Sequence, residues 1–247
     1  MKIVSWNVNH RASEKKIPKN LADGILSLNP DIVILTEFVL AKSRDQFIKD
    51  LVNYGLVHIR TSNFVPGENS IFVASNVLLN NGSIKAPLLA PSIPTNFYHL
   101  ELPTKNLHLI AIRIPDYSKF LKIKRTYWDW LIEMAKSFEA DNCLMIGDFN
   151  TSPLYAKSRC GDKFQQLADV GWRKVSPETG NSYWTPKGVG VQIDHAFMKG
   201  AFDIVKSEFI EKNNDYYFVG RNCQSLSDHA VLCIEIKEAV SGHKVKK

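Results

Sequence analysis

Apolar and β-branched residues recur along the chain in short runs, several of which alternate with polar residues. Eight runs of this kind predict β-strands, at residues 2–8, 31–36, 70–74, 97–102, 107–114, 142–147, 191–198 and 230–236. Three longer segments carry apolar residues at helical spacing and predict α-helices, at residues 18–28, 43–53 and 118–138.

Two of the predicted helices carry a further signal. Ser43, followed three residues later by Gln46, has the pattern of a capping box and predicts that the second helix begins there. The third helix has an apolar stripe that includes Leu121, Trp128 and Leu131, which is typical of a face packed on the core.

The order of the predicted elements is neither a strict βαβ alternation nor that of an all-β protein. Because the strands are too numerous for one comfortable sheet, they predict two packed sheets with helices outside, an α+β architecture. A chain of 247 residues can bury one sizeable core and not clearly two. We therefore expect a single domain over residues 1–240 and a disordered basic tail at 241–247.

The composition is that of a soluble globular protein, with 45% hydrophobic and 23% charged residues. The first residues lack the pattern of a signal peptide, and no apolar stretch approaches the roughly 18 residues of a membrane span. We therefore expect a cytoplasmic protein without membrane contact. The four cysteines lack metal-site spacing and are expected to be free thiols. A formal net charge of +6 favours polyanionic partners without identifying one.

Acidic, amide and imidazole side chains stand where the predicted apolar strands end. They are Asn7, Glu37, Asp148, Asn150, Asp194, Asp228 and His229. Each could instead belong to a turn, but their recurrence at five strand ends forms a coherent set. Oxygen donors without paired thiolates suit a hard cation such as Mg²⁺, and a histidine beside carboxylates can stabilise charge on a phosphoryl oxygen. The set predicts a metal-assisted reaction at phosphorus.

Five short blocks, in this order, make the chain resemble the endonuclease/exonuclease/phosphatase superfamily. The blocks are Ser5–Asn9, Asp31–Glu37, Gly147–Asn150, Gln192–His195 and Ser227–His229, which extend over nearly the whole chain. The resemblance implies a four-layer αββα sandwich of the DNase I type, in which two mixed β-sheets pack together and are flanked by helices. It also implies a metal-dependent hydrolase of phosphoric esters that uses Mg²⁺, with Mn²⁺ as an alternative.

The resemblance implies a metal-binding part of the site. Glu37 corresponds to the principal metal ligand, and Asn7 lies close to the metal and the phosphate in relatives. Asp228 corresponds to a metal ligand or to a hydrogen-bonding support.

It also implies a catalytic part. Asp148 corresponds to the residue that orients or deprotonates the attacking water, and Asn150 to the amide that holds the phosphate or the nucleophile. His229 corresponds to the histidine that contacts the scissile phosphate, oriented by Asp194. Together these roles describe in-line attack of water on phosphorus.

The chain departs from the family pattern at two positions. Asn9 stands where many nucleases of the family carry an acidic residue, which removes a charge from the metal site. Arg113 aligns best with a tyrosine or histidine near the end of the middle strand. Arginine is no general base, but its planar fork suits a phosphate, so we expect Arg113 to clamp a substrate phosphate. The alternatives are a surface arginine or a misaligned strand.

Other residues have weaker signals. Asn9, Tyr183 and Trp184 could contact nucleic acid, the two aromatic residues by stacking on bases, or the aromatic pair could simply pack. His195 should face away from Asp194 if the strand alternates. His58, His99, His108 and His243 show no partner pattern.

The leading interpretation is a nuclease that hydrolyses phosphodiester bonds in DNA or RNA. One alternative is a phosphatase or phosphodiesterase acting on a phosphoinositide or another small phosphate ester, because a fold does not decide a substrate. Another is a catalytically degenerate protein that binds nucleic acid, against which the intact set of site residues argues. The oligomeric state is not encoded in any pattern here, and a monomer is the default.

Overall fold

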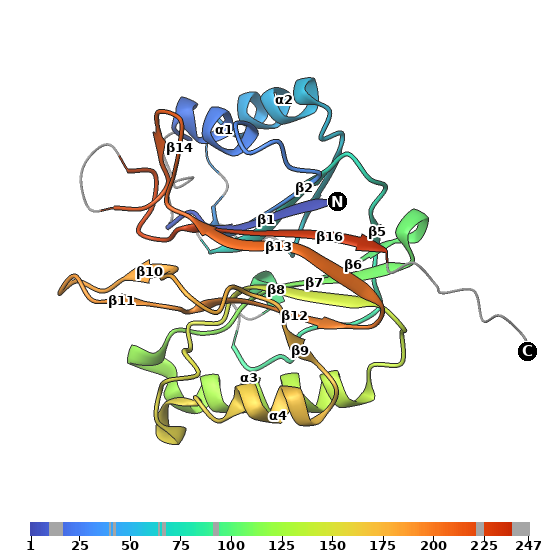
Figure 1. The fold of residues 1–247 in the computed structure, drawn as a ribbon, viewed down its shortest axis with the longest axis vertical. Coiled ribbons are helices and arrows are strands. Elements are labelled where there is room, and N and C mark those ends of the chain that lie inside the picture. Colours follow the sequence, from blue (N-terminus) through green and yellow to red (C-terminus); the bar gives the residue numbers. More distant parts are fainter. Residues whose placement is uncertain are drawn as a thin grey trace, which may run out of the picture.

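The computed structural model describes residues 1–9, 17–39, 41, 43–63, 65, 68–90, 94–220 and 225–238. Two six-stranded mixed sheets pack face to face (Figure 1). Helices α1 (Lys19–Leu26) and α2 (Arg44–Tyr54) cover one sheet, and α3 (Tyr117–Ser137) and α4 (Lys163–Asp169) cover the other. The predicted four-layer αββα sandwich is thereby confirmed.

The first sheet has the strand order β13-β16-β1-β2-β4-β3, and the second has the order β5-β6-β7-β8-β12-β9. The strands of the first sheet are β1 (Lys2–Asn7), β2 (Ile32–Phe38), β3 (His58–Thr61), β4 (Ser70–Ser75), β13 (Phe202–Ile210) and β16 (Val231–Glu238). Those of the second are β5 (Asn80–Asn81), β6 (Phe97–Leu102), β7 (Leu107–Arg113), β8 (Cys143–Asp148), β9 (Arg173–Lys174) and β12 (Asp194–Lys199). Two hairpins complete the described strands, β10 (Tyr183–Trp184) with β11 (Gly190–Val191) and β14 (Lys212–Asn213) with β15 (Tyr216–Tyr217). Single-turn 3₁₀ helices occur at Pro94–Asn96, Pro103–Lys105 and Lys157–Arg159.

Three apolar cores hold the layers together. The middle core lies between the sheets and is built from alternate strand residues such as Ile34, Leu109 and Ile146. The two outer cores lie between each sheet and its helices, and Trp128 on the predicted stripe of α3 is fully buried in one of them. Because both faces of each sheet are covered, the central strands are apolar almost throughout.

All eight predicted strands and all three predicted helices are present, with the segment predicted at 191–198 divided between β11 and β12. The nine-residue strand β13 was not predicted. A shift of register between Ile204 and Lys206 marks a β-bulge, after which the inward-facing positions change from even to odd numbers. This change of phase hides the alternation on which a sequence prediction depends.

The predicted capping box at the start of α2 is wrong. Ser43 is the N-cap residue, but its side chain makes no capping hydrogen bond, and the amide of Gln46 donates instead to Asp50 at 2.8 Å. The backbone of Ser43, at φ −90° and ψ 12°, lies outside the extended region from which a cap hydroxyl reaches the first turn.

Three further observations concern the remaining sequence predictions. Cys143, Cys160 and Cys233 are buried free thiols, and Cys223 lies outside the described residues. No helix in the described ranges combines the length and the apolar character needed to cross a bilayer. The predicted basic tail at 241–247 lies outside the described residues.

Candidate active site

The polar strand ends of both sheets meet around one cavity of about 340 Å³. Its lining residues come from segments far apart in the sequence: Asn7, Asn9, Glu37, Arg113, Asp116, Asn150, Tyr155, Arg159, Tyr183, Thr185, Ile193, Asp228 and His229. The fold thus brings Asn7, Asn9, Glu37, Arg113, Asn150, Tyr183, Asp228 and His229, all expected from the sequence, to one place.

Asp148 lies behind this lining and is buried. Its Oδ1 accepts the backbone N–H of Asn150 at 2.8 Å, and its Oδ2 accepts the side-chain amides of Asn7 at 2.9 Å and Asn150 at 3.0 Å. Asn150 is itself held, because its amide also donates to the carbonyl of Ile114 at 2.9 Å. The carboxylate therefore has one defined orientation, fixed from both sheets.

Two carboxylates stand side by side on neighbouring strands, because Asp148 on β8 pairs directly with Asp194 on β12. Burial and the charge of Asp194 raise the pKa of Asp148 to about 7, against the lowering effects of His229 and Arg113. An aspartate with a pKa near 7 can exchange a proton with water at physiological pH.

Asp194 in turn orients His229. Its Oδ2 lies 2.8 Å from Nδ1 of His229, and both side chains are buried. The backbone of His229 is fixed as well, since its N–H donates to the hydroxyl of Ser227 and its carbonyl accepts the indole N–H of Trp6 at 2.8 Å. Burial lowers the pKa of His229, but the charge and hydrogen bond of Asp194 outweigh it and raise the pKa to about 9. The imidazole is therefore positively charged at neutral pH.

Glu37 reaches the cavity from an irregular point of β2, where the pairing with β4 shifts register. Its backbone has a positive φ of 53°, a conformation uncommon outside glycine and asparagine. Oε1 of Glu37 accepts two hydrogen bonds from Arg113, from Nη2 at 2.6 Å and from Nε at 3.0 Å. Arg113 Nε also lies 3.8 Å from Asp148 Oδ2. Arg113 thus lines the cavity and does not lie on the outer surface, so the alternative of a surface arginine is wrong.

The remaining predicted positions divide into two groups. Asn9 donates its backbone N–H to Asn7 Oδ1 at 2.8 Å, and Tyr183 packs on the ring of His229 with centroids 4.9 Å apart. Trp184, the next residue of β10, is half-buried and does not contribute to the described lining. Neighbouring strand residues face opposite sides, which explains this difference between Tyr183 and Trp184.

His195 likewise faces away from Asp194, as expected. Its ring is fully buried between Phe149 and Phe164, and Nε2 lies 3.0 Å from the carbonyl of Thr151. Burial lowers the pKa of His195 to about 3. His195 is therefore a neutral core residue beneath the site.

Several residues of the site carried no sequence signal. Lys124 on α3 is fully buried, and its ammonium donates to the carbonyl of Asn150, so it holds the loop after β8 from below. Burial lowers the pKa of Lys124 to about 8, in part offset by nearby acidic groups. At the rim, the guanidinium of Arg159 stacks on Tyr155 with its carbon 3.9 Å from the ring centroid. A lysine at a core position of a helical stripe is the one feature that could have drawn attention to Lys124.

The acidic groups of the cavity suit a hard divalent cation. Glu37, Asp148, Asp194 and Asp228 bring four carboxylates to a largely buried site. Burial is the first cause of the raised pKa of Asp148, and the excess of negative charge from Asp194 and Glu37 raises it further. A cation with oxygen ligands would relieve the excess, so the residues fit Mg²⁺ or Mn²⁺.

Comparisons with known proteins agree with this geometry. A family model described as the Endonuclease/Exonuclease/phosphatase family matches residues 4–229. No curated protein matches the chain by sequence. Among solved structures, the chain is similar to the 3′ phosphatase NExo from Neisseria bound to a product DNA hairpin, at 18% identity and a TM-score of 0.70 over 96% of this chain and 99% of that one.

Two further solved structures give the same picture. An AP endonuclease from Archaeoglobus fulgidus is similar at 16% identity and a TM-score of 0.70, over 95% of this chain and 98% of that one. D. rerio TDP2 complexed with a single strand DNA product is similar at 14% identity and a TM-score of 0.70, over 96% of this chain and 98% of that one. At such identities the likeness shows a shared fold.

Proposed function

The chain belongs to the endonuclease/exonuclease/phosphatase family, whose members are hydrolytic enzymes acting on phosphoric esters, and from this premise we propose that it is a Mg²⁺-dependent nuclease. The observation that carries the proposal is the meeting of Glu37, Asp148 and the Asp194–His229 pair around one cavity. Such a site brings a base, a cationic donor and a cluster of oxygen ligands together at one cavity.

The residues divide the work of hydrolysis between them. Asp148 accepts the proton of the attacking water, because its pKa of about 7 makes it both ionised and basic near neutral pH. Asn7 and Asn150 keep that carboxylate in place through three hydrogen bonds. On the other side, His229 donates from Nε2 to a phosphate oxygen, since Nδ1 is held by Asp194.

Glu37, Asn7 and Asp228 are the residues that would hold the cation. When bound, Mg²⁺ supplies positive charge to the phosphate oxygens and the leaving oxygen. Arg113 would have to leave Oε1 of Glu37, at least in part, and could then turn its planar fork to the substrate phosphate. In this way the cation would replace Arg113 beside Glu37, and Arg113 would bind the substrate phosphate.

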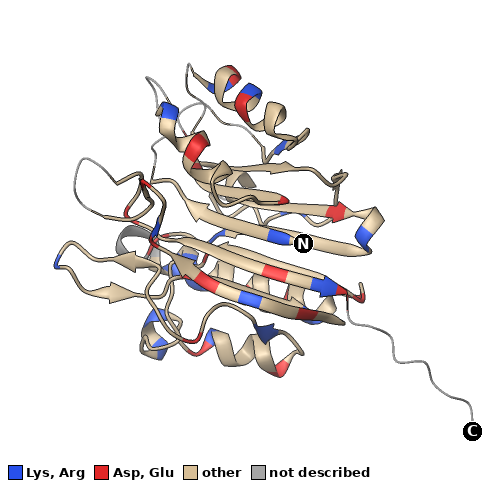
Figure 2. Cartoon of the chain, turned by 45° about the horizontal axis from the view of Figure 1, so that its top comes forward, with Lys and Arg blue, Asp and Glu red and all other residues tan. Residues whose placement is uncertain are grey.

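Nucleic acid is the proposed substrate for two reasons. Two similar structures contain DNA products, and a net charge of +6 favours a polyanion. The charge argument is the weaker one, because acidic and basic residues are interspersed along β13, β16 and the helices (Figure 2). Tyr183 offers a ring surface at the cavity on which a base could stack.

A substrate panel tests the proposal. The protein is incubated with labelled duplex DNA, an abasic-site duplex, a 3′-phosphorylated duplex, single-stranded DNA, RNA and a soluble phosphoinositide, each with Mg²⁺, Mn²⁺ or EDTA. We expect metal-dependent cleavage of a nucleic acid, with a rate that falls steeply with log salt at subsaturating substrate. Hydrolysis of the phosphoinositide alone, with little dependence on salt, would favour the small-substrate alternative. Binding of nucleic acid without any hydrolysis would favour the degenerate one.

A further inference from the structure

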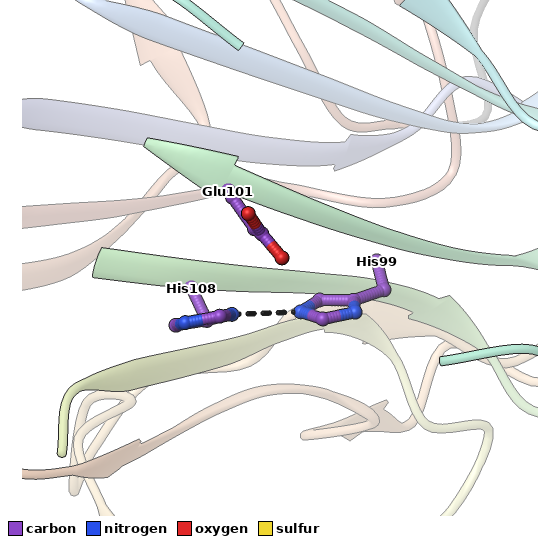
Figure 3. Close-up of side chains that lie close together, drawn as sticks. All are labelled: His99, Glu101 and His108. Atoms are coloured by element: carbon purple, nitrogen blue, oxygen red, sulfur yellow. Dashed lines mark hydrogen bonds between the residues drawn. The ribbon is translucent and has the colours of Figure 1, made fainter. Parts of the chain in front are cut away.

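A second cluster of ligand-type side chains lies far from the catalytic cavity, on the helix-facing side of the second sheet. It consists of His99 and Glu101 on β6 and His108 on β7 (Figure 3). One ligand atom from each of the three residues lies within 4.8 Å of the other two. In register, His108 pairs with the first residue of β8, whereas Arg113 pairs with Asp148 at its end. The two positions are five residues apart along β7, or roughly 16 Å.

The two rings are positioned before any ligand arrives. Nε2 of His99 lies 3.0 Å from Nδ1 of His108, and both rings make T-shaped contacts with the ring of Phe138. The ring of His99 also rests on Gly82, where a Cβ would lie only 2.1 Å from Nδ1. The absence of a side chain at position 82 therefore makes room for the imidazole of His99 and fixes the position of its ring.

The donor set and its surroundings suit a transition metal. Two imidazoles and one carboxylate are ligands that zinc accepts, with about 3.3 Å between neighbouring ligand atoms in a tetrahedral site. The observed separation of the two nitrogens differs from this by a few tenths of an ångström. His99 and His108 also line an open groove of about 650 Å³ together with Glu133 and Glu139, which gives an ion and a completing water a path of entry.

We propose that His99, Glu101 and His108 form a binding site for Zn²⁺ or a similar borderline divalent ion, separate from the catalytic site. The ion would tie β6 to β7 at the end of the sheet remote from catalysis, and would stabilise the folded protein by mass action. The imidazoles distinguish this site from the oxygen-rich catalytic cavity, which favours hard cations.

The hydrogen bonds predict what zinc must change. The backbone N–H of Ile84 donates to Nδ1 of His99 at 3.1 Å, which leaves the ring proton on Nε2, directed at His108. Coordination needs Nε2 without its proton, so the proton moves to Nδ1 and the Ile84 N–H loses its acceptor. Zinc binding therefore breaks the hydrogen bond from the Ile84 N–H to His99. Loss of this bond should weaken the affinity for zinc by about tenfold to a hundredfold, relative to a site in which no hydrogen bond has to break.

Calorimetric titration with ZnCl₂ in excess Mg²⁺ tests the proposal, with the Glu37→Gln variant used to suppress binding at the catalytic site. We expect one zinc ion per chain in both proteins, and at least about tenfold weaker binding in His108→Gln and Glu101→Gln. Gly82→Ala keeps all three ligands but displaces the His99 ring, so it should weaken zinc binding too. His58→Gln, which changes a histidine on the other sheet, is the matched control and should bind as wild type does.

Thermal unfolding without zinc checks that each variant is folded. Zinc should then raise the Tm of wild type but not of His108→Gln. Hydrogen exchange should show that the Ile84 amide exchanges faster when zinc is bound. Equal zinc affinity in wild type, Glu101→Gln and His108→Gln would overturn the proposal. Binding that disappears in Glu37→Gln would assign the ion to the catalytic cavity instead, and an unchanged Ile84 amide would exclude Nε2 of His99 as a ligand.

Discussion

Replacing Arg113 by glutamine should make the stability of the protein depend on divalent cations. Arg113 is the guanidinium that balances Glu37, at 2.6 Å, and it also lies 3.8 Å from Asp148. The three side chains are only 16%, 11% and 1% exposed, so little water is present to replace the lost charge. Removal of one partner from a buried ion pair costs about 3–5 kcal/mol, and the lower end applies at the rim of a cavity.

A loss of about 3 kcal/mol corresponds to a fall in Tm of about 6–12 °C for a chain of this size. This fall is expected in EDTA. In saturating Mg²⁺ the gap between variant and wild type should narrow, because a cation then takes over the role of the guanidinium. For the same reason, Mg²⁺ should bind the variant more tightly than it binds wild type.

The assay is thermal unfolding followed by circular dichroism, in EDTA and in a Mg²⁺ series. Arg60→Gln is a suitable control, because the guanidinium of Arg60 donates to the backbone carbonyls of Ile59 on the edge strand β3 and of Leu79, none of which lines the catalytic cavity. Its effect on Tm should be the same with and without Mg²⁺. A change of less than about 2 °C in Arg113→Gln, or an equal change in both buffers, would refute the reasoning.

Three further predictions follow from the geometry of the site. The pH profile of kcat/KM should rise as Asp148 ionises near pH 7 and fall as His229 loses its proton near pH 9, because the mechanism needs a carboxylate and an imidazolium. A higher Mg²⁺ concentration should move the acid limb of this profile to lower pH. An acid limb whose position does not depend on Mg²⁺ would contradict the assignment of Asp148 as the base. Asn9→Asp should tighten Mg²⁺ binding, measured by calorimetry, because it adds a carboxylate to the cavity lining; weaker binding would count against this site for the ion. Gly147→Ala should cost at least about 2 kcal/mol in urea unfolding, because its φ is +147° and a Cβ would lie 2.0 Å from a backbone carbonyl oxygen of β7. Gly188→Ala, at φ +79° in open space, should cost only about 1 kcal/mol, and equal costs would show that the close contact is unimportant.

The strand ends explain why much of the site could be predicted from sequence. Asn7, Asp148 and Asp194 each begin or end a run of buried apolar residues, and such runs have few alternatives to a central strand. The two-residue period also predicted that His195 faces away from its neighbour. The order of the five short sequence blocks along the chain was then sufficient to recognise the family.

Contacts between layers could not be predicted in this way. Lys124 occupies a core position on α3 that periodicity assigns to packing, and only the tertiary fold places its ammonium beneath Asn150. His99 and His108 are nine residues apart with no motif between them, and the hairpin of β6 and β7 alone brings their rings together. Arg113 was expected to face a phosphate, whereas its partner in the structure is Glu37, a residue of the other sheet.

The central claim is that the buried carboxylates and His229 carry out phosphoester hydrolysis. It is tested most directly by turnover of the preferred substrate of the panel, in saturating Mg²⁺, by wild type, Asp194→Asn and Glu101→Gln. Asp194→Asn removes the charge that keeps His229 protonated, and Glu101→Gln makes the same chemical change at the far end of the second sheet. We predict a loss of about a hundredfold or more in kcat for Asp194→Asn and wild-type turnover for Glu101→Gln, with both variants folded. Wild-type turnover by Asp194→Asn would contradict the account.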